Sequence, residues 1–136
     1  MTLLAIPNVS EGREQAAIDA IARAFETAHA RLLDVHTDTD HHRSVFTLAG
    51  EPGELANAVA NGATEVVRQV DLNAHEGIHP RVGAIDVAPI VYLDPADRGA
   101  ACSEALVLAD LLGDQLELPV FLYGELAQGR TRAELR

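Results

Sequence analysis

Lysine is missing from this sequence: all ten basic residues are arginine. The absence excludes chemistry that forms a Schiff base on a lysine or that uses a lysine amine as nucleophile. Arginine has a planar guanidinium that binds carboxylates and phosphates through two hydrogen bonds at once. The basic residues therefore suit the binding of anions.

Cysteine, aromatic residues and long apolar runs are also scarce. Cys102 is the single cysteine, so no disulfide can form within the chain, as is typical of a reducing compartment. Aromatic residues make up 4% of the chain, so Ala, Val, Leu and Ile must build the core. No apolar run approaches the roughly 18 residues of a membrane span, and the N-terminal segment does not resemble a secretory signal. We expect a cytoplasmic protein.

Positive charge is in deficit, with 21 acidic residues against ten arginines and a net charge of −11. Nucleic acids and anionic membranes bind to basic patches, so this balance argues against both as partners. A small anionic ligand needs only a few local arginines. The length of 136 residues fits one domain, which buries about 68% of its unfolded surface.

The hydrophobic pattern predicts an α+β fold. Amphipathic helices are expected over roughly 13–28, from 52–53 to about 70, and over 99–117, with Ser10 or the Gly12 region capping the first. Strands are expected near 3–6, 31–35, 44–50, 84–93 and 119–123, and Pro89 indicates a sheet edge or bulge. The order βαββαβαβ predicts a ferredoxin-like βαββαβ unit with an added αβ, in which a largely antiparallel sheet carries its helices on one face.

One polar connection, residues 75–86, combines two histidines, an arginine and two glycines. Histidine takes up and releases protons near neutral pH, so it suits general acid/base catalysis. His79 is the better candidate of the two, because Pro80 fixes the backbone beside it and Arg81 can orient an anion. His75 is expected to be a neighbour of the site.

A second polar stretch, residues 34–43, contains three histidines, three aspartates and an arginine. Histidine and aspartate side chains are good metal ligands. However, His41 and His42 are adjacent, and neighbours on an extended chain point to opposite sides. The spacing therefore gives poor support for a tight metal site. The alternative is that His29, His41 and His42 are solvated surface histidines, and we favour this for His29. Cys102 lies among alanines and leucines and is expected to be a small core residue.

Several segments together resemble the glutamate formiminotransferase (glutamate formimidoyltransferase) family, whose module also forms the N-terminal part of formiminotransferase-cyclodeaminase. The resemblance runs from about Leu4 to Glu125. It implies an N-terminal subdomain over 1–125, followed by a tail or the start of a missing second subdomain over 126–136. The segments that carry it are PNVSEGR at 7–13, DV at 34–35, HRSVFT at 42–47, GIHPRVGAIDV at 77–87 and PVFLYGE at 119–125.

The resemblance implies transfer of a formimino group from N-formiminoglutamate to tetrahydrofolate, a step of histidine degradation and one-carbon metabolism. Tetrahydrofolate is then a co-substrate. His79 occupies the place of the family's catalytic histidine, which would accept the proton from folate N5 and later protonate the departing glutamate nitrogen. The substrate-binding residues that the resemblance implies are Asn8, His36, His42, Arg43 and Arg81.

The chain departs from the family pattern beside these residues. The family usually has glutamate where Ile78 stands, often has an acidic residue near His36, and commonly has asparagine in place of His42. An acidic neighbour would hold and charge His79, so its loss affects both the pKa and the orientation of that histidine.

Two other functions stay open on the sequence alone. One is a non-catalytic folate- or carboxylate-binding or regulatory module of the same fold. The other is a metal-binding protein that uses histidines and aspartates, with the histidines at positions 36, 41, 42, 75 and 79. A single ferredoxin-like layer leaves one sheet face exposed, so we also expect a homodimer or docking with a second subdomain.

Overall fold

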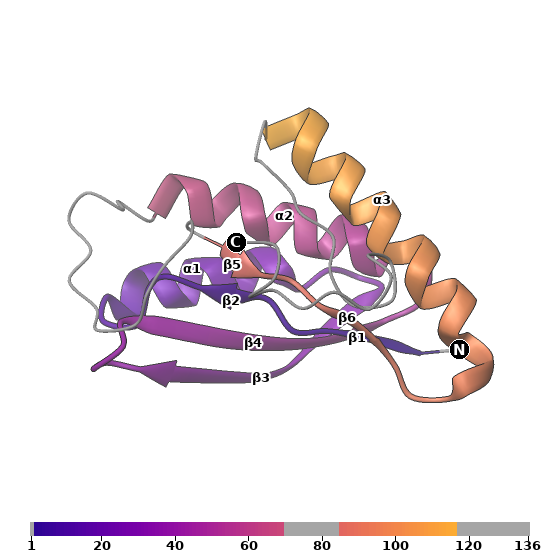
Figure 1. Ribbon diagram of the computed structural model, residues 1–136. Helices are drawn as coiled ribbons and strands as arrows, with labels where there is room; N and C mark the ends of the chain where they lie inside the picture. The colour runs from indigo at the N-terminus through magenta and orange to yellow at the C-terminus, as the bar shows by residue number, and fades with distance from the viewer. Residues whose placement is uncertain (1, 70–84, 117–136) are drawn as a thin grey trace, which may run out of the picture.

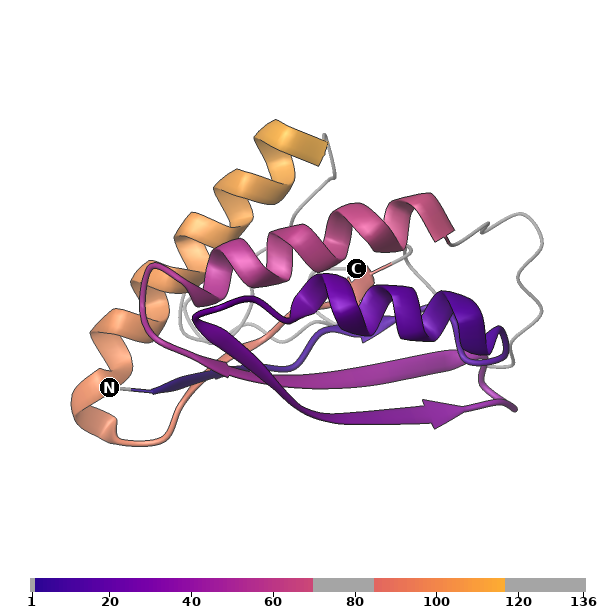
Figure 2. The same ribbon diagram turned by 180° about the vertical axis from the view of Figure 1, so that it is seen from behind.

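A computed structural model of the chain describes residues 2–69 and 85–116. The described part is an antiparallel sheet with its helices on one side, which confirms the predicted α+β class (Figure 1, Figure 2). The predicted strand at 119–123 and the connection at 70–84 lie outside these residues.

The described strands are β1 (Leu3–Ala5), β2 (Asn8–Val9), β3 (Ala30–Asp38), β4 (Arg43–Gly50), β5 (Ile85–Val87) and β6 (Ile90–Tyr92). The described helices are α1 (Gln15–Phe25), α2 (Leu55–Gln69) and α3 (Arg98–Leu116), and a 3-10 turn covers Pro95–Asp97.

Strand β4 is the centre of the sheet. It pairs with β3 along one edge and with both β1 and β2 along the other, always antiparallel. Among the described strands, β6 lies beside β1, β5 lies beside β2, and β3 pairs with β4. Pro89 separates β5 from β6, and its carbonyl accepts a hydrogen bond from Ile6 N at 3.0 Å. The single strand predicted over 84–93 is therefore two short strands, each at an edge of the sheet as far as residues 2–69 and 85–116 show. The break that Pro89 indicates is confirmed.

Side chains alternate strictly along β4. Ser44, Phe46 and Leu48 are buried on the helix side, whereas Arg43 and Val45 are partly exposed on the other side. This alternation is the normal geometry of a strand. It gives the sheet an inner face, which forms the core, and an outer face, which carries the polar side chains.

Strand β3 keeps the same two faces by means of an irregularity. The pairing register shifts between Leu32 and Asp34, so Leu33 becomes an extra residue with half of its surface exposed. Leu32 and Val35 consequently both pack against the core, although they are three residues apart. The shift brings His36 to the outer face.

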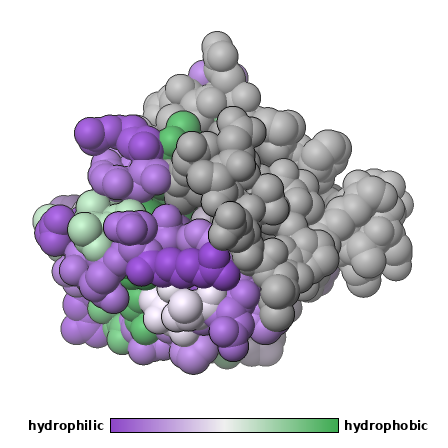
Figure 3. Space-filling view, turned by 90° about the vertical axis from the view of Figure 1, so that its left-hand side faces the viewer, coloured by the Kyte–Doolittle hydropathy of each residue, from purple (hydrophilic) through white to green (hydrophobic). Residues whose placement is uncertain are grey.

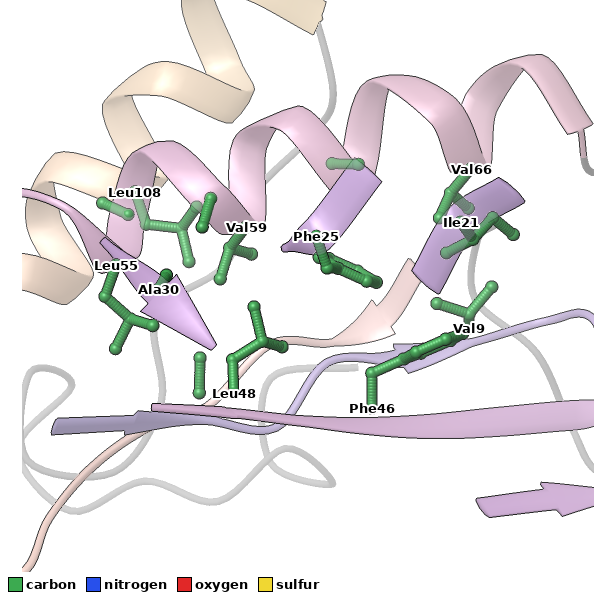
Figure 4. Close-up of a cluster of buried hydrophobic side chains, with 14 of the residues drawn as sticks. Val9, Ile21, Phe25, Ala30, Phe46, Leu48, Leu55, Val59, Val66 and Leu108 are labelled. Atoms are coloured by element: carbon green, nitrogen blue, oxygen red, sulfur yellow. The ribbon is translucent and has the colours of Figure 1, made fainter. Parts of the chain in front are cut away.

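The core lies between the sheet and the helices (Figure 4). The rings of Phe25 on α1 and Phe46 on β4 are 5.0 Å apart at 49°, a tilted contact worth about 0.5–1.5 kcal/mol beyond its buried area. A Cβ atom at Gly62 would overlap the Phe25 ring, so α2 needs glycine where it meets α1. Further fully buried members of the core include Leu3, Val9, Ile21, Leu48, Leu55, Val59 and Val66.

A side chain of α3 binds backbone N–H groups at the start of α2. The Glu104 carboxylate is buried, and it accepts hydrogen bonds from Gly53 N at 2.6 Å and from Ala56 N at 2.7 Å. The first N–H groups of a helix have no partner inside the helix, and negative charge is favourable there. Glu104 thus joins two helices through backbone groups. None of the helices in the described ranges has the length and hydrophobicity that crossing a membrane requires.

Replacing Gly62 by alanine should destabilise the fold by about 1–3 kcal/mol, because the new methyl group collides with the Phe25 ring. The matched control is Gly113→Ala on α3, where a Cβ meets nothing within 4 Å. That change should stabilise by about 0.5–1 kcal/mol through helix propensity. Urea unfolding of both variants measures the difference. Equal stabilisation by both substitutions would contradict the close contact.

Glu104→Ala should lower the free energy of unfolding by about 2–4 kcal/mol, since two charge-assisted hydrogen bonds are lost and the N–H of Ala56 remains buried without this acceptor. Glu104→Gln keeps one acceptor oxygen and should lose less. Asp110→Ala, an exposed carboxylate of the same helix, should change stability by less than about 0.5 kcal/mol. If Glu104→Ala behaves like Asp110→Ala in thermal and chemical unfolding, the capping role is wrong.

Candidate functional site

The outer face of the sheet holds an open pocket of about 340 Å³ near the turn between β3 and β4. This volume lies within the range of sites for small molecules. Figure 3 looks toward the end of the molecule where this turn lies, and the coloured surface there is mostly hydrophilic. The pocket is lined by Asn8, His36, Asp38, His41, Arg43 and Val45.

The register of the sheet explains why these residues meet. Val45 on β4 is directly opposite Asn8 on β2 and His36 on β3, so the three form one row across the sheet. Arg43 is opposite Asp38, two residues further along both strands. Because side chains two residues apart share a face, all five belong to the outer face. Three of the predicted substrate-binding residues, Asn8, His36 and Arg43, therefore surround one pocket.

Arg43 is held in position by Asn8. Its Nη2 donates a hydrogen bond to Asn8 Oδ1 at 2.5 Å, and Asn8 Nδ2 donates to the Ile6 carbonyl at 3.0 Å. The second bond identifies the nitrogen side of the Asn8 amide, so its oxygen faces the guanidinium. A guanidinium has five N–H donors in a planar fork, which allows it to bind Asn8 and a carboxylate at the same time.

Asp38 and His41 form a second pair at the pocket. Asp38 Oδ1 accepts hydrogen bonds from Asp40 N at 3.0 Å and His41 N at 3.2 Å, and Asp38 Oδ2 lies 2.6 Å from His41 Nδ1. The backbone N–H of His41 lowers the pKa of the Asp38 carboxyl; desolvation opposes this effect, and the side chain of His41 adds to it. The contact between Asp38 and His41 was not predicted from the sequence, where their spacing of three residues across a turn is the signal for the pair.

His42 is not among the residues that line this pocket. Its Nδ1 accepts a hydrogen bond from Gly12 N at 3.0 Å, while Glu11 Oε2 lies 3.5 Å away. The backbone bond is the shorter contact, and it needs the lone pair of Nδ1, so we assign it and not an ion pair. His42 has φ 54°, a left-handed conformation that histidine and asparagine tolerate better than most residues. Its substrate-binding role stays a prediction.

The loop before α1 lies tightly against the β3–β4 turn. A Cβ atom at Gly12 would be 2.5–2.7 Å from backbone atoms of Asp38 and Arg43. Only glycine allows the two backbone segments to approach so closely. Ser44, which is buried, donates a hydrogen bond from its hydroxyl to the Glu11 carbonyl. These contacts fix the distance between the Asn8 loop and the strands that carry Arg43 and Asp38.

Glu11 orders the segment that leads into α1. Its Oε2 accepts hydrogen bonds from Arg13 N at 3.1 Å and Glu14 N at 3.0 Å. The N-cap of α1 is Glu14, and no side chain makes a capping hydrogen bond there. The expectation that Ser10 or the Gly12 region provides the cap is therefore wrong, although sequence patterns favour serine at that position.

The other predicted site residues, His79 and Arg81, lie outside the described residues, as does His75. Within ranges 2–69 and 85–116, no group of three or more His, Cys, Asp or Glu side chains is placed to hold a metal ion. Cys102, the single cysteine of the sequence, is partly buried on α3.

Comparison with known proteins places these features in a family. Residues 2–136 match the family model of the formiminotransferase domain, N-terminal subdomain. The chain is 37% identical over 135 residues to formimidoyltransferase-cyclodeaminase of Sus scrofa, covering 96% of this chain and 24% of that protein. It is 35% identical over 131 residues to the glutamate formimidoyltransferases of Thermoplasma acidophilum and Streptococcus pyogenes serotype M1, covering 96% of this chain and 43% and 44% of those proteins.

The chain thus spans about a quarter of the length of the first of these relatives and less than half of the other two. The formimidoyltransferase-cyclodeaminases and the glutamate formimidoyltransferases are both transferases, and the match extends over nearly the whole of this chain. The resemblance seen in the sequence is confirmed: the chain belongs to the family of formiminotransferase N-terminal subdomains.

Proposed function

We propose that this chain takes part in transfer of a formimino group from N-formiminoglutamate to tetrahydrofolate, and that its outer-face pocket binds the glutamate portion. The observation that carries the proposal is the Arg43 guanidinium, which Asn8 holds at the wall of a pocket of about 340 Å³. Glutamate supplies carboxylates that match such a fork. Two relatives are glutamate formimidoyltransferases, a name that fits the same ligand.

In the proposed reaction, the lone pair of folate N5 attacks the formimino carbon and forms a new C–N bond. His79 accepts the proton that N5 loses. The bond between the formimino carbon and the glutamate nitrogen then breaks, and His79 returns the proton to that nitrogen. The products are glutamate and a formimino group on N5 of the folate. A histidine that moves a proton in this way contributes about 10²–10⁴-fold to the rate.

The second candidate is a module that binds the carboxylate ligand without turnover. It is supported by the contact between Asn8 and Arg43 at the pocket, because this contact accounts for binding of a carboxylate without any chemical step. In this case the pocket keeps its affinity for the glutamate portion, and formimino transfer requires residues supplied by another chain or domain. A homodimer, docking with a second subdomain and a cytoplasmic location also stay predictions.

Arg43→Lys should weaken binding of N-formimino-L-glutamate by on the order of tenfold, because an ammonium group cannot reproduce the planar fork. Isothermal titration calorimetry on the purified chain measures this effect. The control is Arg68→Lys, in which the arginine is exposed on α2 and paired with Glu65. Unchanged affinity in Arg43→Lys, or equal losses in both variants, would contradict a carboxylate site at Arg43.

The purified chain should form glutamate when supplied with N-formimino-L-glutamate and tetrahydrofolate, and His79→Ala should reduce the rate by about 10²–10⁴-fold. His29→Ala, which removes an exposed histidine, should leave the rate unchanged. Glutamate release measured by an enzyme-coupled assay decides between the two candidates. Binding without release of glutamate would favour the non-catalytic module, and full activity in His79→Ala would remove that residue from the mechanism.

A further inference from the structure

The Asp38–His41 pair has no role in the proposed reaction, although both residues line the same pocket as Arg43. Asp38 is the last residue of β3 and stands directly opposite Arg43, the first residue of β4. His41 lies in the turn that connects the two strands. The pair and the arginine thus occupy adjoining parts of one outer face.

The hydrogen bonds of Asp38 determine which nitrogen of His41 carries a proton. The Asp38 carboxylate accepts two backbone N–H bonds at Oδ1, which hold it in the ionised, acceptor-only form. The His41 nitrogen 2.6 Å from Oδ2 must therefore be the donor of that contact. A carboxylate that fixes one ring nitrogen in this way also fixes the tautomer and the ring orientation. In its neutral form, His41 carries its lone pair on Nε2.

The pocket consequently offers two kinds of binding group. Arg43 provides N–H donors and a positive charge. In its neutral form, the His41 ring provides an acceptor, with the negative charge of Asp38 behind it. The side chains of His41 and Asp38 are 42% and 39% exposed, so the pair is accessible to a ligand. An arginine beside a histidine–aspartate pair matches a ligand that carries a carboxylate and a cationic N–H donor a short distance apart.

We propose that His41, positioned by Asp38, binds the cationic amidine end of the ligand whose carboxylate is bound by Arg43. The identity of that ligand rests on the proposed function, because the formimino group of N-formiminoglutamate is an amidine. A protonated amidine presents N–H donors to the His41 lone pair. An N-formyl group has the same size but is neutral, and it presents a carbonyl oxygen, which is an acceptor, in the same place. His41 is therefore the residue that distinguishes an amidine from an amide.

The matched ligands N-formimino-L-glutamate and N-formyl-L-glutamate test this role. Calorimetry on the wild-type chain should give an affinity on the order of tenfold higher for the formimino compound, as expected for one hydrogen bond to a charged group. His41→Ala and Asp38→Asn should abolish most of this preference and leave the affinity for the formyl compound nearly unchanged. His29→Ala should keep the preference. Asp38→Asn retains an oxygen for the backbone bonds, so this variant is expected to fold.

A second measurement separates the inference from the proposed function. The ¹⁵N NMR shifts of His41 should report a proton on Nδ1 in the wild type and a changed tautomer in Asp38→Asn, and acetamidinium chloride should shift the Nε2 signal of the wild type. If acetamidinium acts in this way but the glutamate compounds do not bind, amidine recognition stands and the proposed function fails. If the preference survives in His41→Ala, or if Nε2 carries the proton in the neutral ring, the inference is overturned even when formimino transfer is observed.

Discussion

The alternation of side chains along β4 is the constraint on which both the core and the site depend. Phe46 and Leu48 enter the core, and Arg43 and Val45, which alternate with them, reach the outer face. A shift of one residue in the register would exchange the two sets. The stability of the core therefore fixes the place of the pocket, because burying Phe46 against Phe25 requires Arg43 to point the other way.

Glycine and a few polar contacts then set the fine geometry of the pocket. Gly12 allows the loop before α1 to touch the backbone of the β3–β4 turn. His42, in a left-handed conformation, ends that turn and accepts the N–H of Gly12. A backbone conformation of this kind costs about 1–3 kcal/mol and persists where its surroundings determine it. Asn8 and Arg43 are thus presented from two segments whose spacing is fixed by backbone contact and not by flexible side chains.

The sequence predicted the elements better than the contacts between them. Helices at 13–28 and 99–117 were recognisable because their apolar residues recur at helical spacing, and α1 and α3 agree with them within a few residues. Local patterns could not reveal the extra residue at Leu33, because a register shift depends on the partner strand. The role of Glu104 was also invisible: an acidic residue inside a predicted helix is normally exposed, and its partners are 48 and 51 residues away.

Contacts between elements also explain why the sequence predicted only part of the site. Asn8, His36 and Arg43 were named from family motifs, and the sheet brings them to one pocket, whereas Asp38 and His41 were missed. On an extended chain, adjacent residues such as His41 and His42 point to opposite sides. In a turn, however, the backbone folds back, and residues three apart such as Asp38 and His41 come into contact. A turn that starts at an aspartate is common, so this pairing was the signal available in the sequence.

The most direct test of the account is a titration of the ¹⁵N-labelled chain with N-formimino-L-glutamate, followed by amide NMR spectra. The account predicts that the largest shift changes fall on the outer face of the sheet, at β2, the first residues of β4 and the β3–β4 turn. The inner-face residues Phe46 and Leu48 should change little. Changes centred on the helices, or no saturable change at millimolar ligand, would contradict a glutamate-binding site at Arg43.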